Sequence, residues 1–175
     1  MSGERVDLRL DRRAGGAVAF LTIDNRAKLN TLDRALMTDF IGKVETLASR
    51  DDLRALVLRG GGDKAFIGGA SIPEMATLTR DTAREFITLV HRTCDCLRRL
   101  PVPVIAAIDG YALGAGLEVA VSCDLRVATT RAKFGMPETK VGIPSVVEAA
   151  LIPHSIGFGR ARELLMLGEI VDAGT

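Results

Sequence analysis

The sequence predicts an α/β fold, because runs typical of buried strands alternate with segments of helical periodicity. Residues 17–24 form an apolar, β-rich run that closes on Asp24-Asn25, and residues 55–58 form a second that leads into Gly60-Gly61-Gly62. Apolar residues between these two runs recur at helical spacing. Strands separated by helices need parallel crossover connections, which gather loops and helix N-termini at one end of a sheet.

Two long amphipathic helices are expected. The first helix follows a cap at Thr31 or Asp33. Its apolar stripe consists of Leu36, Phe40, Val44 and Leu47. The second is expected over residues 82–100, where Thr82 and Glu85 have the spacing of a capping box. Pro101 and Pro103 end that helix.

The remaining elements are shorter. We expect a buried strand at 104–108, a short apolar helix at 116–122, a strand at 125–128 and a helix at 158–167. No repeat, low-complexity tract or linker divides the chain. With 175 residues, of which 47% are hydrophobic, the sequence predicts one globular domain.

Composition excludes several classes of partner. The formal net charge is +1, from 23 basic and 22 acidic residues, which gives no general field for nucleic acid or anionic lipid. Three cysteines without a disulfide-framework spacing favour a reducing compartment, so we expect a cytoplasmic protein. The first 13 residues lack the apolar run of a secretory signal, and no apolar stretch is long enough to cross a bilayer.

Glu118 and Glu138 are the most informative residues, because each follows a glycine-bearing turn in an apolar stretch. Apolar surroundings raise a carboxyl pKa, so two such acids in one cavity could exchange protons near neutral pH. The turn Gly114-Ala115-Gly116 also leads into the short apolar helix, where a first-turn amide can bind a developing negative charge. The alternative is that these glycines only permit a tight strand-to-helix connection.

Four segments in order resemble the signature of the crotonase, or enoyl-CoA hydratase/isomerase, superfamily: residues 64–72, 110–118, 122–124 and 134–138, preceded by a match at 24–30. The resemblance covers nearly the whole chain. It implies a spiral of ββα units that assembles into trimers or dimers of trimers. It also implies an acyl-CoA substrate, with coenzyme A as part of that substrate, and neither a separate cofactor nor a metal.

By this resemblance, the backbone amides of Ala70 and Ala115 form an oxyanion hole for a thioester enolate. Glu118 activates the water that attacks C3 of a trans-2-enoyl-CoA, and Glu138 delivers the proton to C2. Hydration of this kind belongs to fatty acid metabolism, including β-oxidation. Members that only move a double bond generally keep one of the two acids, so an enoyl-CoA isomerase is the nearest alternative, and a catalytically silent binding or assembly subunit is another.

The resemblance also assigns substrate-binding positions. Arg26, Lys28 and Lys64 occupy loops where relatives hold the CoA phosphates, although basic loop residues are usually only solvated. The other predicted substrate-binding residues are Leu29, Gly69, Ile72 and Gly114.

The sequence departs from the family pattern in several places. Ser71 replaces a common aspartate but keeps the capacity to cap a helix. Where many hydratases have a glycine-rich loop, this chain places Glu148 near the acyl pocket; we interpret Glu148 as a surface acid on a helix and expect Glu138 in a loop. The chain stops at Thr175, where relatives continue into a helical C-terminal region, so the core domain 1–175 is expected to be truncated and to expose apolar surface around Phe158.

Other motifs fit less well. Gly114-x-Gly116 has Val119 where a dinucleotide fingerprint needs a third glycine, and residues 60–64 lack the spacing of a P-loop. Cys94 and Cys96 point to different sides of a helix and are interpreted as buried or half-buried thiols. His91 and His154 are interpreted as isolated surface or packing histidines.

Overall fold

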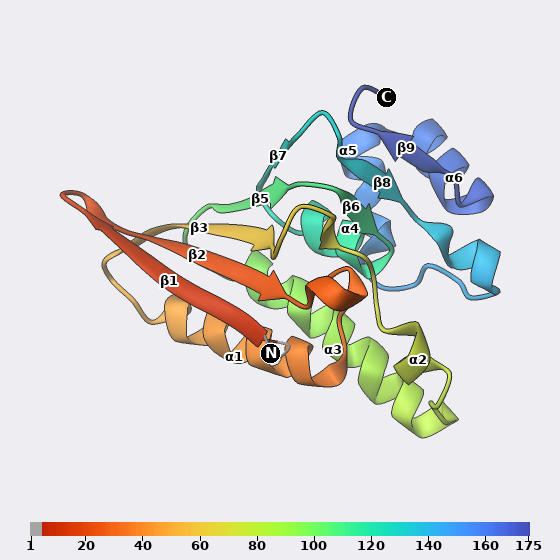
Figure 1. Cartoon of the computed structure of the whole chain (residues 1–175), viewed down its shortest axis with the longest axis horizontal. Helices are drawn as coiled ribbons and strands as arrows, with labels where there is room; N and C mark the ends of the chain where they lie inside the picture. The colour runs from red at the N-terminus through yellow and green to blue at the C-terminus, as the bar shows by residue number, and fades with distance from the viewer. Residues whose placement is uncertain (1–4) are drawn as a thin grey trace.

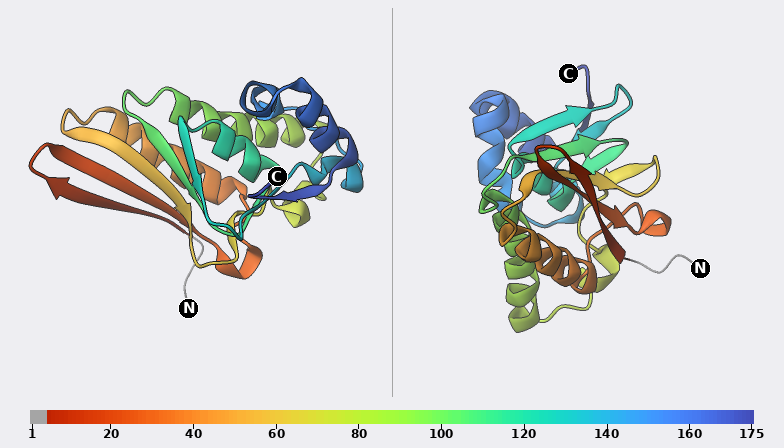
Figure 2. Two further views of the ribbon diagram at one scale, coloured as in Figure 1. Left: turned by 90° about the horizontal axis from the view of Figure 1, so that it is seen from above. Right: turned by 90° about the vertical axis from the view of Figure 1, so that its left-hand side faces the viewer.

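The computed structural model describes residues 5–175, which form two β-sheets with the long helices on one side of the larger sheet (Figure 1, Figure 2). The strands are β1 (Arg5–Arg13), β2 (Gly16–Asp24), β3 (Leu53–Gly60), β4 (Ala65–Ile67), β5 (Val104–Ile108), β6 (Tyr111–Leu113), β7 (Leu125–Ala128), β8 (Lys133–Gly135) and β9 (Ile170–Asp172). The α-helices are α1 (Arg34–Ala48), α2 (Ile72–Met75), α3 (Arg80–Arg98), α4 (Ala115–Val121), α5 (Ile152–Ile156) and α6 (Phe158–Leu167). Three 3₁₀ helices are η1 (Arg26–Lys28), η2 (Pro137–Val141) and η3 (Glu148–Leu151).

The larger sheet has the order β1-β2-β3-β5-β7, in which β1 and β2 form an antiparallel hairpin and the other neighbours are parallel. Alternate residues of β2 are fully buried, from Ala17 and Ala19 to Leu21 and Ile23. This period of two places one face of the sheet against the helices.

The smaller sheet has the order β4-β6-β8-β9. Along the chain, β3, β5 and β7 enter the larger sheet, and the short strand that follows each of them enters the smaller one. The connections after β2, β4 and β6 run through α1, then α2 with α3, and then α4. The chain therefore repeats a ββα unit, as the resemblance implies.

The helix N-termini confirm one predicted cap and correct another. Asp33 caps α1, since its Oδ1 accepts a hydrogen bond from the Leu36 amide at 2.8 Å. The capping box of α3, however, pairs Thr79 with Thr82, so the helix begins at Arg80 and the predicted Thr82–Glu85 box is wrong. The Thr82 hydroxyl accepts a hydrogen bond from the Thr79 amide, so the box lies about one helical turn before the predicted one.

α4 packs against α3, η3 and the strands β4 and β6 of the smaller sheet, and all of its residues except Val121 are buried (Figure 1). Gly116 makes this possible, because a Cβ there would lie 2.0 Å from the carbonyl oxygen of Ile67 in β4. Gly116 thus serves the close packing of α4 against β4 rather than the connection from β6 to α4.

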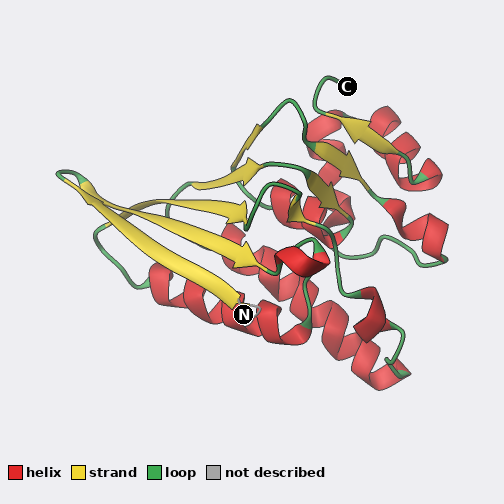
Figure 3. Cartoon of the chain, viewed as in Figure 1, coloured by secondary structure: helices red, strands yellow, loops and turns green. Residues whose placement is uncertain are grey.

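The strands and helices expected at 104–108, 125–128 and 158–167 have the expected bounds. The strand expected at 17–24 begins one residue earlier, and those expected at 55–58, 82–100 and 116–122 differ by one or two residues at both ends. The expected elements leave out β1 and the three-residue strands β4, β6, β8 and β9; Figure 3 draws the strands in yellow. Three residues are too few to reveal an alternation of two. β1 does carry the alternation typical of a half-buried strand, since Val6, Leu8 and Leu10 alternate with charged residues, so its signal is visible in the sequence although it is not among the expected elements.

The C-terminal helix α6 is only partly packed. Leu164 is buried and Leu165 half-buried, whereas Phe158 is 65% exposed and Met166 and Leu167 are also exposed. Within residues 5–175, no helix combines the length and apolar character needed to cross a membrane.

Candidate active site

Glu118 is a buried acid on α4. Its side chain is only 4% exposed, and its Oε1 accepts a hydrogen bond from the Ala149 amide at 2.9 Å. Burial raises the pKa of Glu118 to about 7; the Ala149 hydrogen bond opposes this rise, and the negative charge of Glu138 adds to it. Such a carboxyl group exchanges protons readily near neutral pH.

Glu138 approaches the start of α4 from η2, so the expectation of a loop at this position is wrong. Pro137 occupies the first position of this 3₁₀ turn, where its fixed φ is compatible with a helix start. A Cβ on Gly114 would lie 2.6 Å from Glu138 Oε1, so only glycine leaves room for this carboxylate. Burial raises the pKa of Glu138.

Both acids line one cavity of about 130 Å³. Its walls are otherwise mostly apolar and come from the segment after β4, from α2, α3 and the start of α4, and from residues 137–147: Gly68, Gly69, Ala70, Ile72, Met75, Phe86, Ile87, Val90, Ala115, Pro137, Val141, Ile143, Pro144, Ser145, Val146 and Val147. Among the described residues, Glu138 Oε2 and Ser145 Oγ are buried without a hydrogen-bond partner. The two groups lie near each other, since the Ser145 hydroxyl opposes the rise of the Glu138 pKa.

Two residues of the cavity wall, Ala115 and Ala70, lie at the start of α4 and after β4. Ala115 is the first residue of α4, and the helix makes its first internal bonds from the Leu117 and Glu118 amides to the Gly114 carbonyl. The Ala115 amide therefore has no partner within the helix.

Ala70 forms an isolated parallel bridge with Leu32. The bonds of that bridge use the Gly69 carbonyl and the Ser71 amide, at 2.8 Å each. In a parallel bridge of this kind the flanking residues Gly69 and Ser71 make the hydrogen bonds to Leu32. The amide of Ala70 between them therefore points away from Leu32. Ser71 then caps α2 by accepting from the Glu74 amide, so the predicted capping capacity is confirmed.

The arrangement suits acid/base chemistry on a carbonyl compound. One buried carboxyl group can take a proton while the other gives one, and amide donors at a helix start can stabilise an oxyanion. The structure thus brings Glu118, Glu138, Ala70 and Ala115 to one cavity, together with Gly69 and Ile72 on its wall and Gly114 behind Glu138.

The predicted phosphate-binding residues lie elsewhere. Arg26, Leu29 and Lys64 line a separate hollow of about 320 Å³, and Lys28 lies beside them in η1. Asp24 accepts two hydrogen bonds from the Arg26 guanidinium, at 2.7 and 2.8 Å. Leu29 has φ 55°, a left-handed conformation that is uncommon for a residue with a Cβ.

Several residues near the site were not predicted, or were interpreted wrongly. Glu148 is buried rather than on the surface, and His91 is not isolated, because its Nδ1 lies 2.7 Å from Glu148 Oε1. The two residues are 57 positions apart in sequence, so no local pattern could reveal the contact. Ser145 and the Ala149 amide also gave no sequence signal.

The three cysteines are free; Cys94 and Cys123 are buried and Cys96 is half-buried, as expected for packing residues. Burial raises the pKa of Cys96 to about 12, so this thiol is a poor nucleophile. Residues 5–175 contain no group of three or more histidine, cysteine or acidic side chains placed to hold a metal ion.

Comparison with known proteins identifies the class. The family model described as enoyl-CoA hydratase/isomerase matches residues 13–174. The chain is 34% identical over 159 residues to a short-chain-enoyl-CoA hydratase of Clostridium acetobutylicum, which covers 90% of this chain and 61% of that protein. It is 34% identical over 157 residues to a crotonyl-CoA hydratase of Syntrophomonas wolfei, at 89% and 60% coverage.

A solved structure of an enoyl-CoA hydratase from Bacillus anthracis superposes with a TM-score of 0.89 at 32% identity, covering 95% of this chain and 65% of that one. The chain belongs to the enoyl-CoA hydratase/isomerase family and has the crotonase fold. It spans about 60% of the length of the two curated relatives.

Proposed function

We propose that this chain carries the acid/base and oxyanion groups of an enzyme that hydrates trans-2-enoyl-CoA thioesters to 3-hydroxyacyl-CoA. The observation that carries the proposal is the cavity shared by Glu118, which is buried, and Glu138, which is half-buried, both with raised pKa values. Relatives named as hydratases of enoyl-CoA and crotonyl-CoA support the choice of substrate class.

In this mechanism Glu118, as carboxylate, removes a proton from water, whose oxygen bonds to C3. The C2=C3 electron pair moves toward the thioester, and the amides of Ala70 and Ala115 bind the resulting enolate oxygen. Glu138, as the neutral acid, transfers its proton to C2. One water is consumed, and each carboxyl group ends in the other protonation state, which a single proton exchange restores.

Substrate binding is proposed for two places. The acyl part enters the apolar cavity beside Gly69, Ile72 and Gly114, while Arg26, Lys28, Leu29 and Lys64 contact the CoA moiety. Neutralising Lys64 as Lys64→Ala is then expected to raise KM for the CoA thioester with little change in kcat, because a phosphate contact acts equally on ground and transition states. Assembly into trimers is a further proposal, which light scattering tests.

The test is hydration of crotonyl-CoA, followed by loss of the enoyl thioester absorbance. A 3-enoyl-CoA offered in parallel distinguishes the alternatives. Conversion of the 3-enoyl to the 2-enoyl thioester without hydration would identify an isomerase. Absence of both reactions, with acyl-CoA still bound in calorimetry, would identify a silent binding subunit.

A further inference from the structure

Glu148 is a buried carboxylate that the hydration mechanism leaves unused. Its side chain is 7% exposed, yet it lies between two groups of α3: His91 Nδ1, which donates to Glu148 Oε1 at 2.7 Å, and Arg98 Nη1, which donates to Glu148 Oε2 at 3.5 Å. The same helix supplies Phe86 and Val90 to the cavity wall. Glu148 therefore ties η3 to α3.

Glu148, His91 and Arg98 together are called the Glu148 clamp, and Ala149, the residue after Glu148, connects this clamp to Glu118. The Ala149 amide donates to Glu118 Oε1 at 2.9 Å, and η3 begins at Glu148. Val147, at the N-cap of η3, provides no side-chain cap, because its side chain has no acceptor. η3 also packs against α4 and α5, and the Glu148 side chain adds a polar contact that links it to α3.

We propose that Glu148 is a positioning residue for Glu118: His91 and Arg98 hold its carboxylate, and this fixes the Ala149 amide against Glu118 Oε1. The proposal rests on the proposed function only in treating Glu118 as the base. The placement of the amide is a structural statement that can be tested without catalysis.

The clamp acts on Glu118 in two ways of opposite sign. The Ala149 hydrogen bond favours ionised Glu118, whereas the negative charge of Glu148 opposes it. The other titratable groups that face this region are Glu138 from η2 and, from α3, the Cys94 thiol. A change of charge and a change of geometry at Glu148 should therefore move the pKa of Glu118 in opposite directions.

Three variants separate these effects. Glu148→Gln removes the charge and keeps an acceptor for His91. Glu148→Ala removes both, and His91→Ala keeps the charge but removes one donor. His91 and Arg98 are 53% and 45% exposed, so water can solvate them when Glu148 is absent. His154→Ala, at an exposed histidine on α5, is the matched control.

The readouts are the pH profile of crotonyl-CoA hydration from pH 5.5 to 9 and the titration of the Glu118 carboxyl carbon by ¹³C NMR, assigned with Glu118→Gln. We expect His91→Ala to move the acid limb of the profile and the Glu118 titration upward by about half to one pH unit, the size of one hydrogen-bond change. Activity of His91→Ala at pH 6 then falls by about three- to tenfold. Glu148→Ala should move both upward by less, because loss of its negative charge opposes the shift. Glu148→Gln should show no upward shift, and His154→Ala should match the parent.

An unchanged Glu118 titration in both Glu148→Ala and His91→Ala would overturn the proposal, and so would an upward shift in Glu148→Gln equal to that in Glu148→Ala. Because the carboxyl titration needs no turnover, an inactive parent protein would count against hydration alone. In that case the NMR shifts would still decide whether Glu148 positions Glu118.

Discussion

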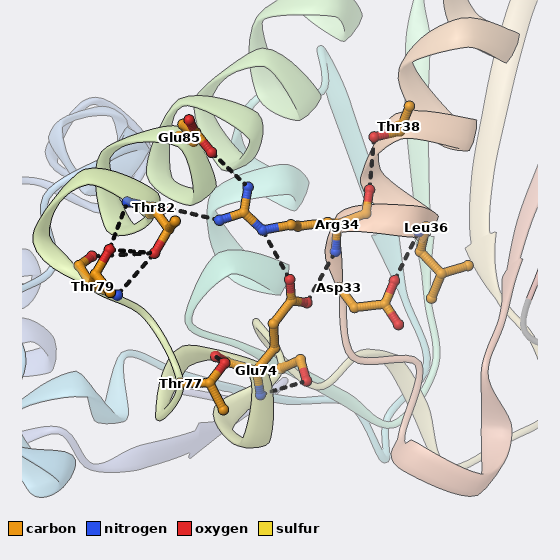
Figure 4. Close-up of polar contacts among 10 residues, drawn as sticks. Asp33, Arg34, Leu36, Thr38, Glu74, Thr77, Thr79, Thr82 and Glu85 are labelled. Atoms are coloured by element: carbon orange, nitrogen blue, oxygen red, sulfur yellow. Dashed lines mark hydrogen bonds and ion pairs between the residues drawn. The ribbon is translucent and has the colours of Figure 1, made fainter.

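Two clusters of carboxylates, one where α1, α2 and α3 meet and the other in the cavity on α4 and η2, differ in how fully their oxygens are paired. The Arg34 junction consists of Arg34, Glu74, Thr82 and Glu85, where α1, α2 and α3 meet (Figure 4). The Arg34 guanidinium contacts Glu74 Oε1 at 3.0 Å, Glu85 Oε2 at 3.4 Å and the Thr82 carbonyl at 2.7 Å, while its amide donates to Glu74 Oε2. Each acid at the junction thus has a cationic partner.

The acids of the cavity have no such partner among the described residues. Glu118 is bound by a backbone amide and Glu138 Oε2 has no partner, so burial is not offset by a positive charge. Charge pairing stabilises carboxylates in their ionised form, whereas burial without it raises the pKa. The comparison indicates that the junction stabilises the fold and that the cavity retains reactive protons.

The largest expected effect comes from neutralising the cavity acids. Glu118→Gln and Glu138→Gln should each reduce hydration by about two to four powers of ten, the usual contribution of a general acid or base. Crotonyl-CoA turnover at fixed pH measures this loss, and circular dichroism checks the fold.

The matched control is Glu74→Gln, the same change at the paired cluster. It should leave turnover within a few-fold of the parent, because Glu74 does not line the cavity. Full hydratase activity in either cavity variant would contradict the paired-carboxylate mechanism.

The next effect tests the amide donor at the start of α4. Proline is tolerated at a first helical position, and Gly114, with φ 50°, is not limited as other residues are before proline. Ala115→Pro should therefore fold and lose about 10² to 10³ in turnover, the usual cost of one oxyanion donor. Unchanged melting together with turnover close to that of the parent would show that the Ala115 amide is not the donor.

A third prediction concerns stability rather than rate. The pKa of Glu118 is about 7 in the folded protein against 4.5 in the unfolded chain. Between these pH values the unfolded chain releases its proton first, so the contribution of Glu118 to stability is present below pH 4.5 and is lost as pH rises through 7. The lost free energy of unfolding is about 3 kcal/mol.

Denaturant unfolding of the parent and of Glu118→Gln at pH 5 and pH 8 measures this loss. The glutamine cannot ionise, so the variant should gain stability relative to the parent at the higher pH. A difference between the two proteins that does not change with pH would show that Glu118 is not buried as an acid.

The smallest expected effect on activity comes from opening the junction. Arg34→Met should lower the free energy of unfolding by about 1–2 kcal/mol, since it removes charge-assisted hydrogen bonds to a partly buried acid. α2 carries Ile72 and Met75, which line the cavity, so KM should rise while kcat stays within a few-fold. A loss of kcat equal to that of Glu118→Gln would remove the distinction between the two clusters.

Local sequence determined much of the fold. The apolar stripe of α1, the strand at 104–108 and the helix at 158–167 follow from periodicity that each segment carries within itself. The sequence predicts the capping box of α3 one turn late, since Thr82 can form a box with either Thr79 or Glu85. Tertiary structure decided this choice, because Glu85 contacts Arg34 instead.

The sequence by itself also marked Glu118, Glu138 and the turn at Ala115, because acids in apolar surroundings and glycines before a helix are visible in a single segment. Only the tertiary structure decided that Glu148 is buried against His91, that the Ala149 amide meets Glu118, and that Ser145 lies unpaired on the cavity wall. The physical reason is that burial and pairing depend on segments far apart in the chain. Whether a carboxylate is solvated, clamped or isolated is settled only when those segments pack together.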